Sequence, residues 1–143
     1  MVAPSESAIL ACVRFFETLT KDSVEDIRTL ASPRMRYRDP LTDAQGIDAV
    51  VAYLHKWFRD LDDIGFQRGD RAQCGNVLLS HWTMQFRVRK MPRRQWTIEG
   101  MSRTTFDDDG KVVDHVDYWD TAPMLEAFPV LGRAVTLIRK LAA

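Results

Sequence analysis

The sequence predicts an α+β domain in which helices lie against one face of a strongly curved sheet. Two observations carry this prediction. Up to Leu61 most apolar residues recur every three or four positions, as on one side of a helix, and from Ile64 they recur every second position, as in a strand. With 143 residues and no internal repeat or linker, residues 1–143 are expected to fold as one domain.

Three helices are expected before the main run of strands. Ser5 or Ser7 caps the first, and a capping pattern that starts at Asp22 opens a short second helix that ends before Pro33. Gly46 introduces the third helix, which carries a wide apolar stripe. These helices supply the layer that covers the sheet.

Five strands are expected from the two-residue alternation. They are Arg34–Asp39, Ile64–Arg68, Asn76–Lys90, Arg94–Phe106 and Lys111–Asp120. Gly110 closes the turn before the last strand and supplies the left-handed residue that a short hairpin loop needs. The last four strands therefore follow one another through hairpin-like connections.

The composition excludes several classes of protein. Twenty Lys plus Arg balance twenty Asp plus Glu, so no net charge attracts nucleic acid. The apolar runs are too short for a transmembrane segment, and the first residues lack the pattern of a signal peptide. Cys12 and Cys74 are expected to be free thiols of a cytoplasmic protein. Because the sequence has no phosphate loop, nucleophile elbow or metal-ligand cluster, neither a cofactor nor a metal is expected.

Three segments resemble those of a known family. They are Tyr37–Pro40, Gly46–Val50 and Phe106–Val113. In this order they resemble the nuclear transport factor 2-like superfamily, in the branch that holds SnoaL-like polyketide cyclases, ketosteroid isomerases and limonene epoxide hydrolase. The resemblance covers Ile9 to Asp120. It implies a cone-shaped mixed sheet packed on three N-terminal helices around a deep, largely apolar cavity, to which this chain adds a C-terminal helix.

The resemblance to ketosteroid isomerases assigns one catalytic residue and questions two others. Asp39 matches the general base, because in both cases an Asp-Pro pair precedes a Gly that opens the third helix. Asp39 is equally consistent with a structural cap of that turn. The tyrosine that donates to the oxyanion corresponds to Phe15, which has no hydroxyl, and the second donor corresponds to Ser102. Steroid isomerisation in its usual form is therefore not expected.

The last strand carries the other candidate catalytic residues. The family's alternation implies that His115, Asp117 and Trp119 face the cavity, whereas a shift by one would turn the intervening residues inward. The segment from Asp117 to Asp120 also resembles one in limonene epoxide hydrolase, where the first Asp is catalytic. The Arg and second Asp that this hydrolase needs are absent from the matching stretch around Trp82, so its mechanism is not expected here.

The remaining candidate site residues are those expected to touch a bound molecule. They are Phe15, Tyr37, Trp57, Ser80, Trp82, Met84, Ser102 and Trp119. Burial beside tryptophans is expected to raise the pKa of Asp117. The favoured function is binding of a small, largely apolar organic molecule, with cofactor-independent acid/base chemistry of isomerase, cyclase or hydrolase type. The alternative is a non-catalytic ligand-binding or protein-interaction module of the same fold.

Two expectations concern surfaces outside the cavity. A homodimer is expected through the outer face of the sheet, where Arg103, Val116 and Tyr118 lie. The apolar stripe of the C-terminal helix, from Val130 to Leu141, must pack on something. A lid over the cone, a dimer partner and a membrane surface are the three destinations, of which the lid is favoured.

Overall fold

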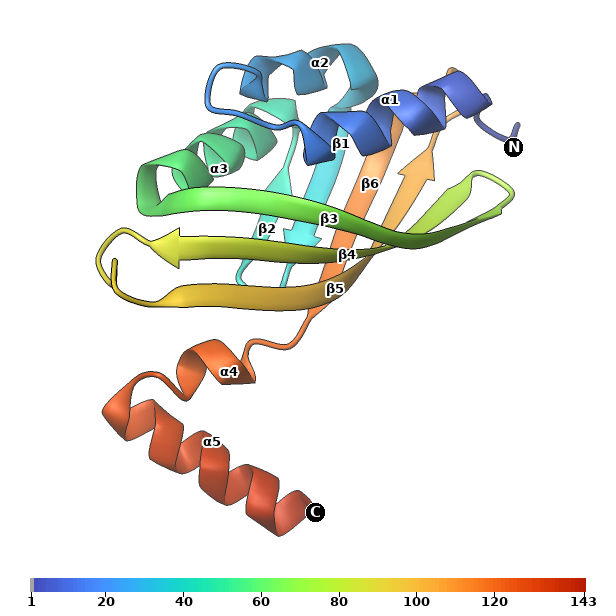
Figure 1. The fold of residues 1–143 in the computed structure, drawn as a ribbon. Helices are drawn as coiled ribbons and strands as arrows, with labels where there is room; N and C mark the ends of the chain where they lie inside the picture. The colour runs from blue at the N-terminus through green and yellow to red at the C-terminus, as the bar shows by residue number, and fades with distance from the viewer. Residues whose placement is uncertain (1) are drawn as a thin grey trace.

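The structure is a computed structural model that describes residues 2–143. The helices are α1 (Glu6–Glu17), the 3₁₀ turn η1 (Val24–Asp26), α2 (Ile27–Leu30), α3 (Ile47–Asp60), α4 (Ala122–Leu125) and α5 (Pro129–Ala142). The strands are β1 (Ala31–Asp39), β2 (Thr42–Gln45), β3 (Leu61–Cys74), β4 (Val77–Val88), β5 (Gln95–Phe106) and β6 (Val112–Trp119). Figure 1 shows that α1, α2 and α3 gather on one side of the sheet, and the α+β class is confirmed.

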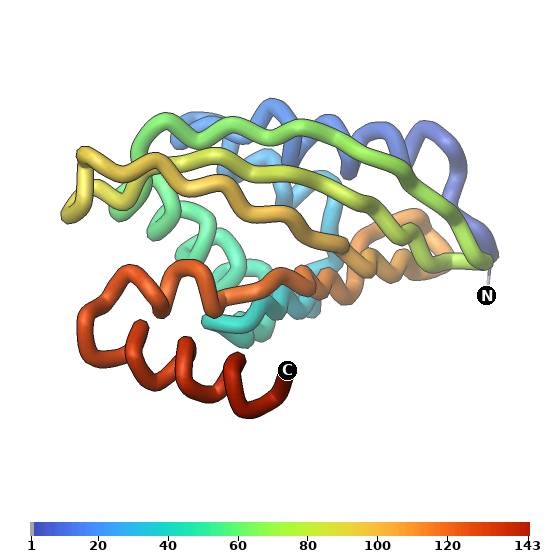
Figure 2. Tube along the Cα trace, turned by 60° about the horizontal axis from the view of Figure 1, so that its bottom comes forward, coloured from blue at the N-terminus to red at the C-terminus, as the bar shows by residue number. Residues whose placement is uncertain are grey.

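The six strands form one mixed sheet in the order β2-β1-β6-β5-β4-β3. Strands β1 and β6 run parallel, and every other neighbouring pair is antiparallel. The sheet curves along β3, β4 and β5, as the tube in Figure 2 shows. This curvature turns the inner faces of β4, β5 and β6 toward the helices.

Two strands differ from the prediction. Strand β2 was not expected, because it is only four residues long and its single apolar residue, Ala44, cannot show an alternation. Strand β3 extends well beyond Ile64–Arg68, since it pairs with β4 from Leu61 to Cys74 through two register shifts. Its second half is exposed on both faces, so no apolar alternation marks it in the sequence.

Two apolar clusters fill the space between the helices and the sheet. The larger joins α1, α2 and α3 to β1 around the buried residues Tyr37, Met35 and Leu54. The smaller lies on β4 and β5 around Met84. Trp57 of α3 packs against both clusters, so this helix ties the two halves of the interior together.

The C-terminal helix does not form the expected lid. In Figure 1 α5 lies away from the cone, joined to it through α4. The side chains of Val130 and Leu141 are 82% and 79% exposed. The lid expectation is therefore wrong for α5, because its polar side, rather than its apolar side, is turned toward α4 by contacts described below. No helix among residues 2–143 is long and apolar enough to cross a membrane.

Candidate functional site

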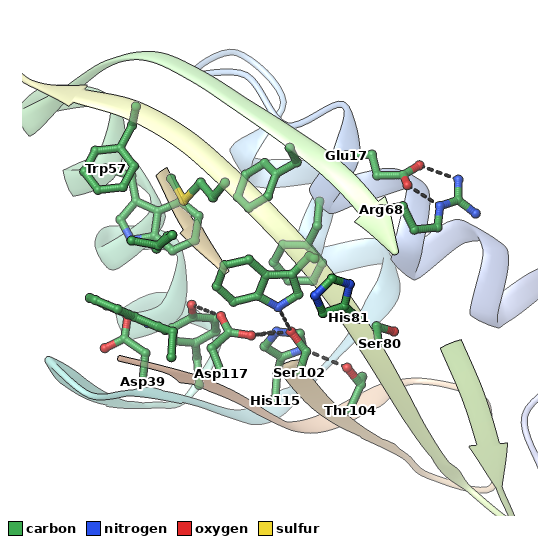
Figure 3. Close-up of a pocket in the computed structure, with 18 of the residues that line it drawn as sticks. Glu17, Asp39, Trp57, Arg68, Ser80, His81, Ser102, Thr104, His115 and Asp117 are labelled. Atoms are coloured by element: carbon green, nitrogen blue, oxygen red, sulfur yellow. Dashed lines mark hydrogen bonds and ion pairs between the residues drawn. The ribbon is translucent and has the colours of Figure 1, made fainter. Parts of the chain in front are cut away.

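A cavity of about 210 Å³ lies inside the cone, between α1, α3 and the inner face of the sheet. Figure 3 shows the side chains that point into it. Most of its wall is apolar and much of it is aromatic, formed by Phe16, Trp57, Phe66, Trp82, Met84, Phe86, Ile98, Trp119 and Met124. Such a wall favours an organic molecule with few polar groups.

Strand pairing places the polar residues of the cavity side by side. The parallel register of β1 and β6 sets Tyr37 opposite His115, and one alternation further along the two strands lie Asp39 and Asp117. On the other side of β6, Ser102 of β5 lies opposite Asp117. The predicted alternation of β6 is correct, since His115, Asp117 and Trp119 all line the cavity.

Asp117 is the centre of a buried hydrogen-bond network. The Tyr37 hydroxyl donates to its Oδ2 at 2.5 Å, and the Ser102 hydroxyl donates to its Oδ1. His115 Nε2 lies 3.0 Å from the same Oδ1. Trp82 Nε1 in turn donates to Ser102 Oγ at 2.8 Å. Three side chains from three strands therefore hold one carboxylate that is only 9% exposed.

This network lowers the pKa of Asp117, so the expectation of a raised pKa is wrong. Burial does act to raise it, as expected. The electrostatic interaction with His115 and the hydrogen bonds from His115, Ser102 and Tyr37 together act more strongly in the opposite direction. Asp117 is therefore a fixed anion at neutral pH, and burial and its negative charge raise the pKa of Tyr37, which keeps its proton.

His115 has both ring nitrogens occupied. Its Nδ1 lies 2.8 Å from the Thr104 hydroxyl, opposite the nitrogen that contacts Asp117. The ring is stacked between Phe16 and Tyr37, at centroid distances of 4.7 and 5.4 Å. These contacts fix the orientation of His115, which in turn positions Asp117.

Asp39 occupies a different environment at the end of β1. Its Oδ1 accepts from the backbone N–H of Leu41 at 2.7 Å, as a cap of the Asp-Pro turn would. Its Oδ2 accepts from the Tyr53 hydroxyl at 2.6 Å. Burial raises the pKa of Asp39, the negative charge of Asp117 adds to that rise, and these two effects exceed the lowering by its hydrogen bonds. Among the described residues no Lys, Arg or His forms an ion pair with Asp39.

The structure brings most of the sequence-derived site residues together. The cavity is lined by Tyr37, Asp39, Trp57, Ser80, Trp82, Met84, Ser102, His115, Asp117 and Trp119. Phe15 is the exception: it is buried in the larger core cluster, and its neighbour Phe16 faces the cavity instead. Counting along α1 without a gap gave Phe15 instead of Phe16 as the residue that faces the cavity. On a helix, a shift of one residue turns the side chain by about 100°.

Several residues of the cavity were not among the sequence-derived site residues, and four of them are large side chains whose absence from that set has a traceable cause. Tyr53 follows Val50 of α3 by three residues and lies one turn before Trp57, so the stripe of that helix was the available signal. Phe66 lies in the strand that was predicted too short, and Met124 belongs to α4. Phe16 is the neighbour of Phe15 described above. Across residues 2–143, no three His, Cys, Asp or Glu side chains converge as metal ligands would.

Two ion pairs border the cavity where it approaches the surface. Arg68 of β3 donates to Glu17 at the end of α1, with Nη2 2.7 Å from Oε2. Lys56 and Asp60 pair within α3. Each pair is neutral as a unit, so neither gives the interior a positive charge with which to hold an anion.

The comparisons agree with this geometry. The SnoaL-like domain family matches residues 12–115, and no curated protein matches the sequence. A nuclear transport factor 2-like protein of unknown function from Burkholderia pseudomallei is 16% identical, with a TM-score of 0.73 over 85% of this chain and 96% of that one. An epoxide hydrolase from Mycobacterium tuberculosis, described as similar to limonene epoxide hydrolase, is 14% identical, with a TM-score of 0.70 over 96% of both chains.

A third solved structure, TerC co-crystallised with polyporic acid, is 18% identical, with a TM-score of 0.70 over 84% of this chain and 94% of that one. At these identities the similarity establishes the fold alone. The family match covers most of the chain, including α3 and the first half of β6 as far as His115. On this match, the chain belongs to the SnoaL-like domain family.

Proposed function

We propose that this protein binds a small, largely apolar organic molecule in the cavity and moves a proton on it, without a cofactor. The observation that carries the proposal is that two carboxyl groups line one apolar cavity and have pKa values shifted in opposite directions. The pKa of Asp39 is raised and the pKa of Asp117 is lowered. Two titratable groups whose environments separate their pKa values are the usual arrangement for acid/base work.

In this proposal Asp39 is the group that exchanges the proton. Its raised pKa makes it a stronger base than an ordinary aspartate, and the Tyr53 hydroxyl holds its carboxylate in one orientation. The carboxylate takes a proton from a carbon or oxygen of the bound molecule and returns it at another atom, so that no net charge is lost. Asp117 stays ionised. Its negative charge and the hydrogen bond that it accepts from the Tyr37 hydroxyl define the polar end of the cavity.

The comparisons support the class of chemistry rather than a substrate. The solved structures that share this fold include an epoxide hydrolase and a protein crystallised with polyporic acid. For this chain we propose only the shared features, which are a carbon skeleton held by apolar walls and one or two oxygen atoms near the carboxylates.

The test is hydrogen exchange on a simple ketone probe. The protein is incubated with 2-cyclohexenone in heavy water, and loss of the acidic C–H signals is followed by proton NMR. Asp39→Asn should reduce the rate of exchange to that of the ketone without protein. The matched control is Asp43→Asn, an exposed aspartate of the neighbouring strand β2 that pairs with Arg36. The added exchange should increase as the pH rises through the raised pKa of Asp39, because only the carboxylate accepts a proton.

A binding module without turnover is the second candidate. It is favoured by α1, which presents Cys12, Val13 and Phe16 to the cavity and no hydroxyl that could stabilise an oxyanion. Quenching of tryptophan fluorescence by the same ketone measures binding, since Trp57, Trp82 and Trp119 line the cavity. Saturable quenching with no added exchange would establish this candidate, and neither signal would contradict both.

A homodimer and a cytoplasmic location accompany the proposal. Exposed apolar side chains on the outer face of the sheet, Leu79, Met101 and Tyr118, support association through that face. Val116, which was expected to contribute, is 6% exposed and offers little surface for such a contact. Sedimentation velocity at micromolar concentration should show twice the mass of one chain.

Two free cysteines are consistent with a reducing compartment.

A further inference from the structure

Helix α5 presents its apolar side to solvent. The large side chains of this side are between 50% and 82% exposed, and they are Val130, Leu131, Leu137, Ile138 and Leu141. Spacings of three, four and seven residues relate them to one another, so they share one face of the helix. We call these five residues the apolar face of α5. Soluble proteins rarely leave such a continuous face without a partner.

Contacts with the residues on either side of α4 hold the helix in this orientation. Gly132 lies so close to Glu126, the residue that follows α4, that a Cβ there would stand 2.4 Å from the carbonyl oxygen of Glu126. On the same side, Arg139 binds Asp120 at 3.0 Å and Glu126 at 3.2 Å. Since these anchors all lie on the polar side of α5, the apolar face is fixed outward. The exposure of the apolar face therefore follows from these contacts.

We propose that the apolar face of α5 docks on an anionic lipid surface, with the helix lying in the plane of the interface. The charge of the segment selects this partner. Residues 129–143 contain Arg133, Arg139 and Lys140 and no acidic residue. Arg133 and Lys140 make no ion pair with any described residue. Basic residues beside an exposed apolar face are typical of helices that lie in a membrane interface.

A second copy of the same helix fits this charge pattern poorly. Arg133 and Lys140 border the apolar face on the edge beside Leu137, whereas Arg139 lies on the polar side and is paired with Asp120 and Glu126. Two antiparallel α5 helices packed through their apolar faces would therefore bring these basic edges together, which destabilises such a pair. Phosphate groups of anionic lipids meet the same edges with opposite charge.

Docking of α5 on lipid would also place one end of the cavity near the membrane. Helix α4, to which α5 is anchored, contributes Met124 to the cavity wall. Docking therefore brings this end of the cavity close to the lipid, where an apolar molecule concentrates. This consequence rests on the proposed function, but the docking itself needs only α5 and is measured without any cavity ligand.

The experiment is cosedimentation of the full chain with vesicles. Binding to vesicles of phosphatidylcholine with phosphatidylserine should exceed binding to phosphatidylcholine alone, and added salt should weaken it. The double variant Leu137→Ser with Leu141→Ser should lose binding. Arg133→Gln with Lys140→Gln should weaken it by about fivefold per charge. Leu10→Ser, which changes an exposed apolar residue on α1, is the matched control and should bind as the parent does.

Two results would overturn the proposal. In one, the parent protein stays in the supernatant with both kinds of vesicle. In the other, sedimentation velocity without lipid shows a dimer that the Leu137 and Leu141 variant converts to a monomer, which would make a second copy the partner. Because both leucines are more than half exposed, circular dichroism should show that the variant keeps the fold.

Discussion

Replacing Asp117 by asparagine removes the charge on which three buried donors converge. Asparagine keeps one oxygen but places an NH₂ group where the carboxylate had its second oxygen. Either the Tyr37 or the Ser102 hydroxyl then faces a donor instead of an acceptor. His115 also loses its anionic partner at 3.0 Å.

The expected cost follows from the strength of these interactions. A hydrogen bond to a charged group contributes roughly 1.5–3 kcal/mol, and leaving a buried donor without its partner costs roughly 1–3 kcal/mol. Because the donors share one carboxylate, their losses do not add in full. We expect Asp117→Asn to lower the free energy of unfolding by about 3–5 kcal/mol, measured by urea denaturation with circular dichroism.

The control is the same substitution on the opposite face of the same strand. Asp114 points outward and accepts from Arg38 at 3.1 Å, where both side chains are partly exposed. Asp114→Asn should cost about 1 kcal/mol or less, as for surface ion pairs. If Asp117→Asn costs no more than this control, the network around Asp117 does not stabilise the fold as we infer.

The dependence on pH has a definite sign. The folded pKa of Asp117 is lowered, so its contribution is present above the unfolded pKa, near about 4, and is lost as the pH falls from there toward the folded pKa. The difference in stability between the parent and Asp117→Asn should therefore shrink as the solution is acidified. An unchanged difference would show that the folded and unfolded pKa values of Asp117 are equal, and a gain of the parent over the variant on acidification would show that the folded pKa is raised.

Three other predictions follow from the same structure. Asp39→Asn should leave the melting temperature at neutral pH unchanged or raised, since a raised folded pKa means that stability is lost as pH rises through it. A thiol reagent should modify Cys74 quickly and Cys12 slowly, because Cys74 is exposed while burial raises the pKa of Cys12 to about 12. Gly100→Ala should displace Trp82, seen as a fluorescence shift, because the new Cβ would lie 2.5 Å from the Trp82 ring.

Much of the fold was predictable because it depends on periodicity. Alternation alone placed His115 and Asp117 on one face of β6, and the structure has them on the cavity side. Strand β2 carries no such signal, since it is four residues long. Matching the family's tyrosine to α1 by counting residues gave Phe15, which is buried in the core instead of the cavity. On a helix, an error of one residue changes the direction in which the side chain points.

The environment of Asp117 was only partly predictable from its own segment. His115, which lowers the pKa of Asp117, lies two residues away, but the other two donors lie 80 residues away at Tyr37 and 15 residues away at Ser102. Only the parallel pairing of β1 with β6 brings Tyr37 into contact. The outward apolar face of α5 has a similar cause, since Gly132 and Arg139 select which side of an amphipathic helix meets α4.

The most direct test of the assigned acid/base roles is a carbon-13 NMR titration of the side-chain carboxyls, with Asp39→Asn and Asp117→Asn used to assign the two signals. We expect the pKa of Asp39 to lie above that of an exposed aspartate and the pKa of Asp117 to lie below it. The two values should also be coupled, because the charge of Asp117 raises the pKa of Asp39. The opposite order, or two values equal to that of an exposed aspartate, would contradict the assignment of Asp39 as the proton-exchanging group and Asp117 as the fixed anion.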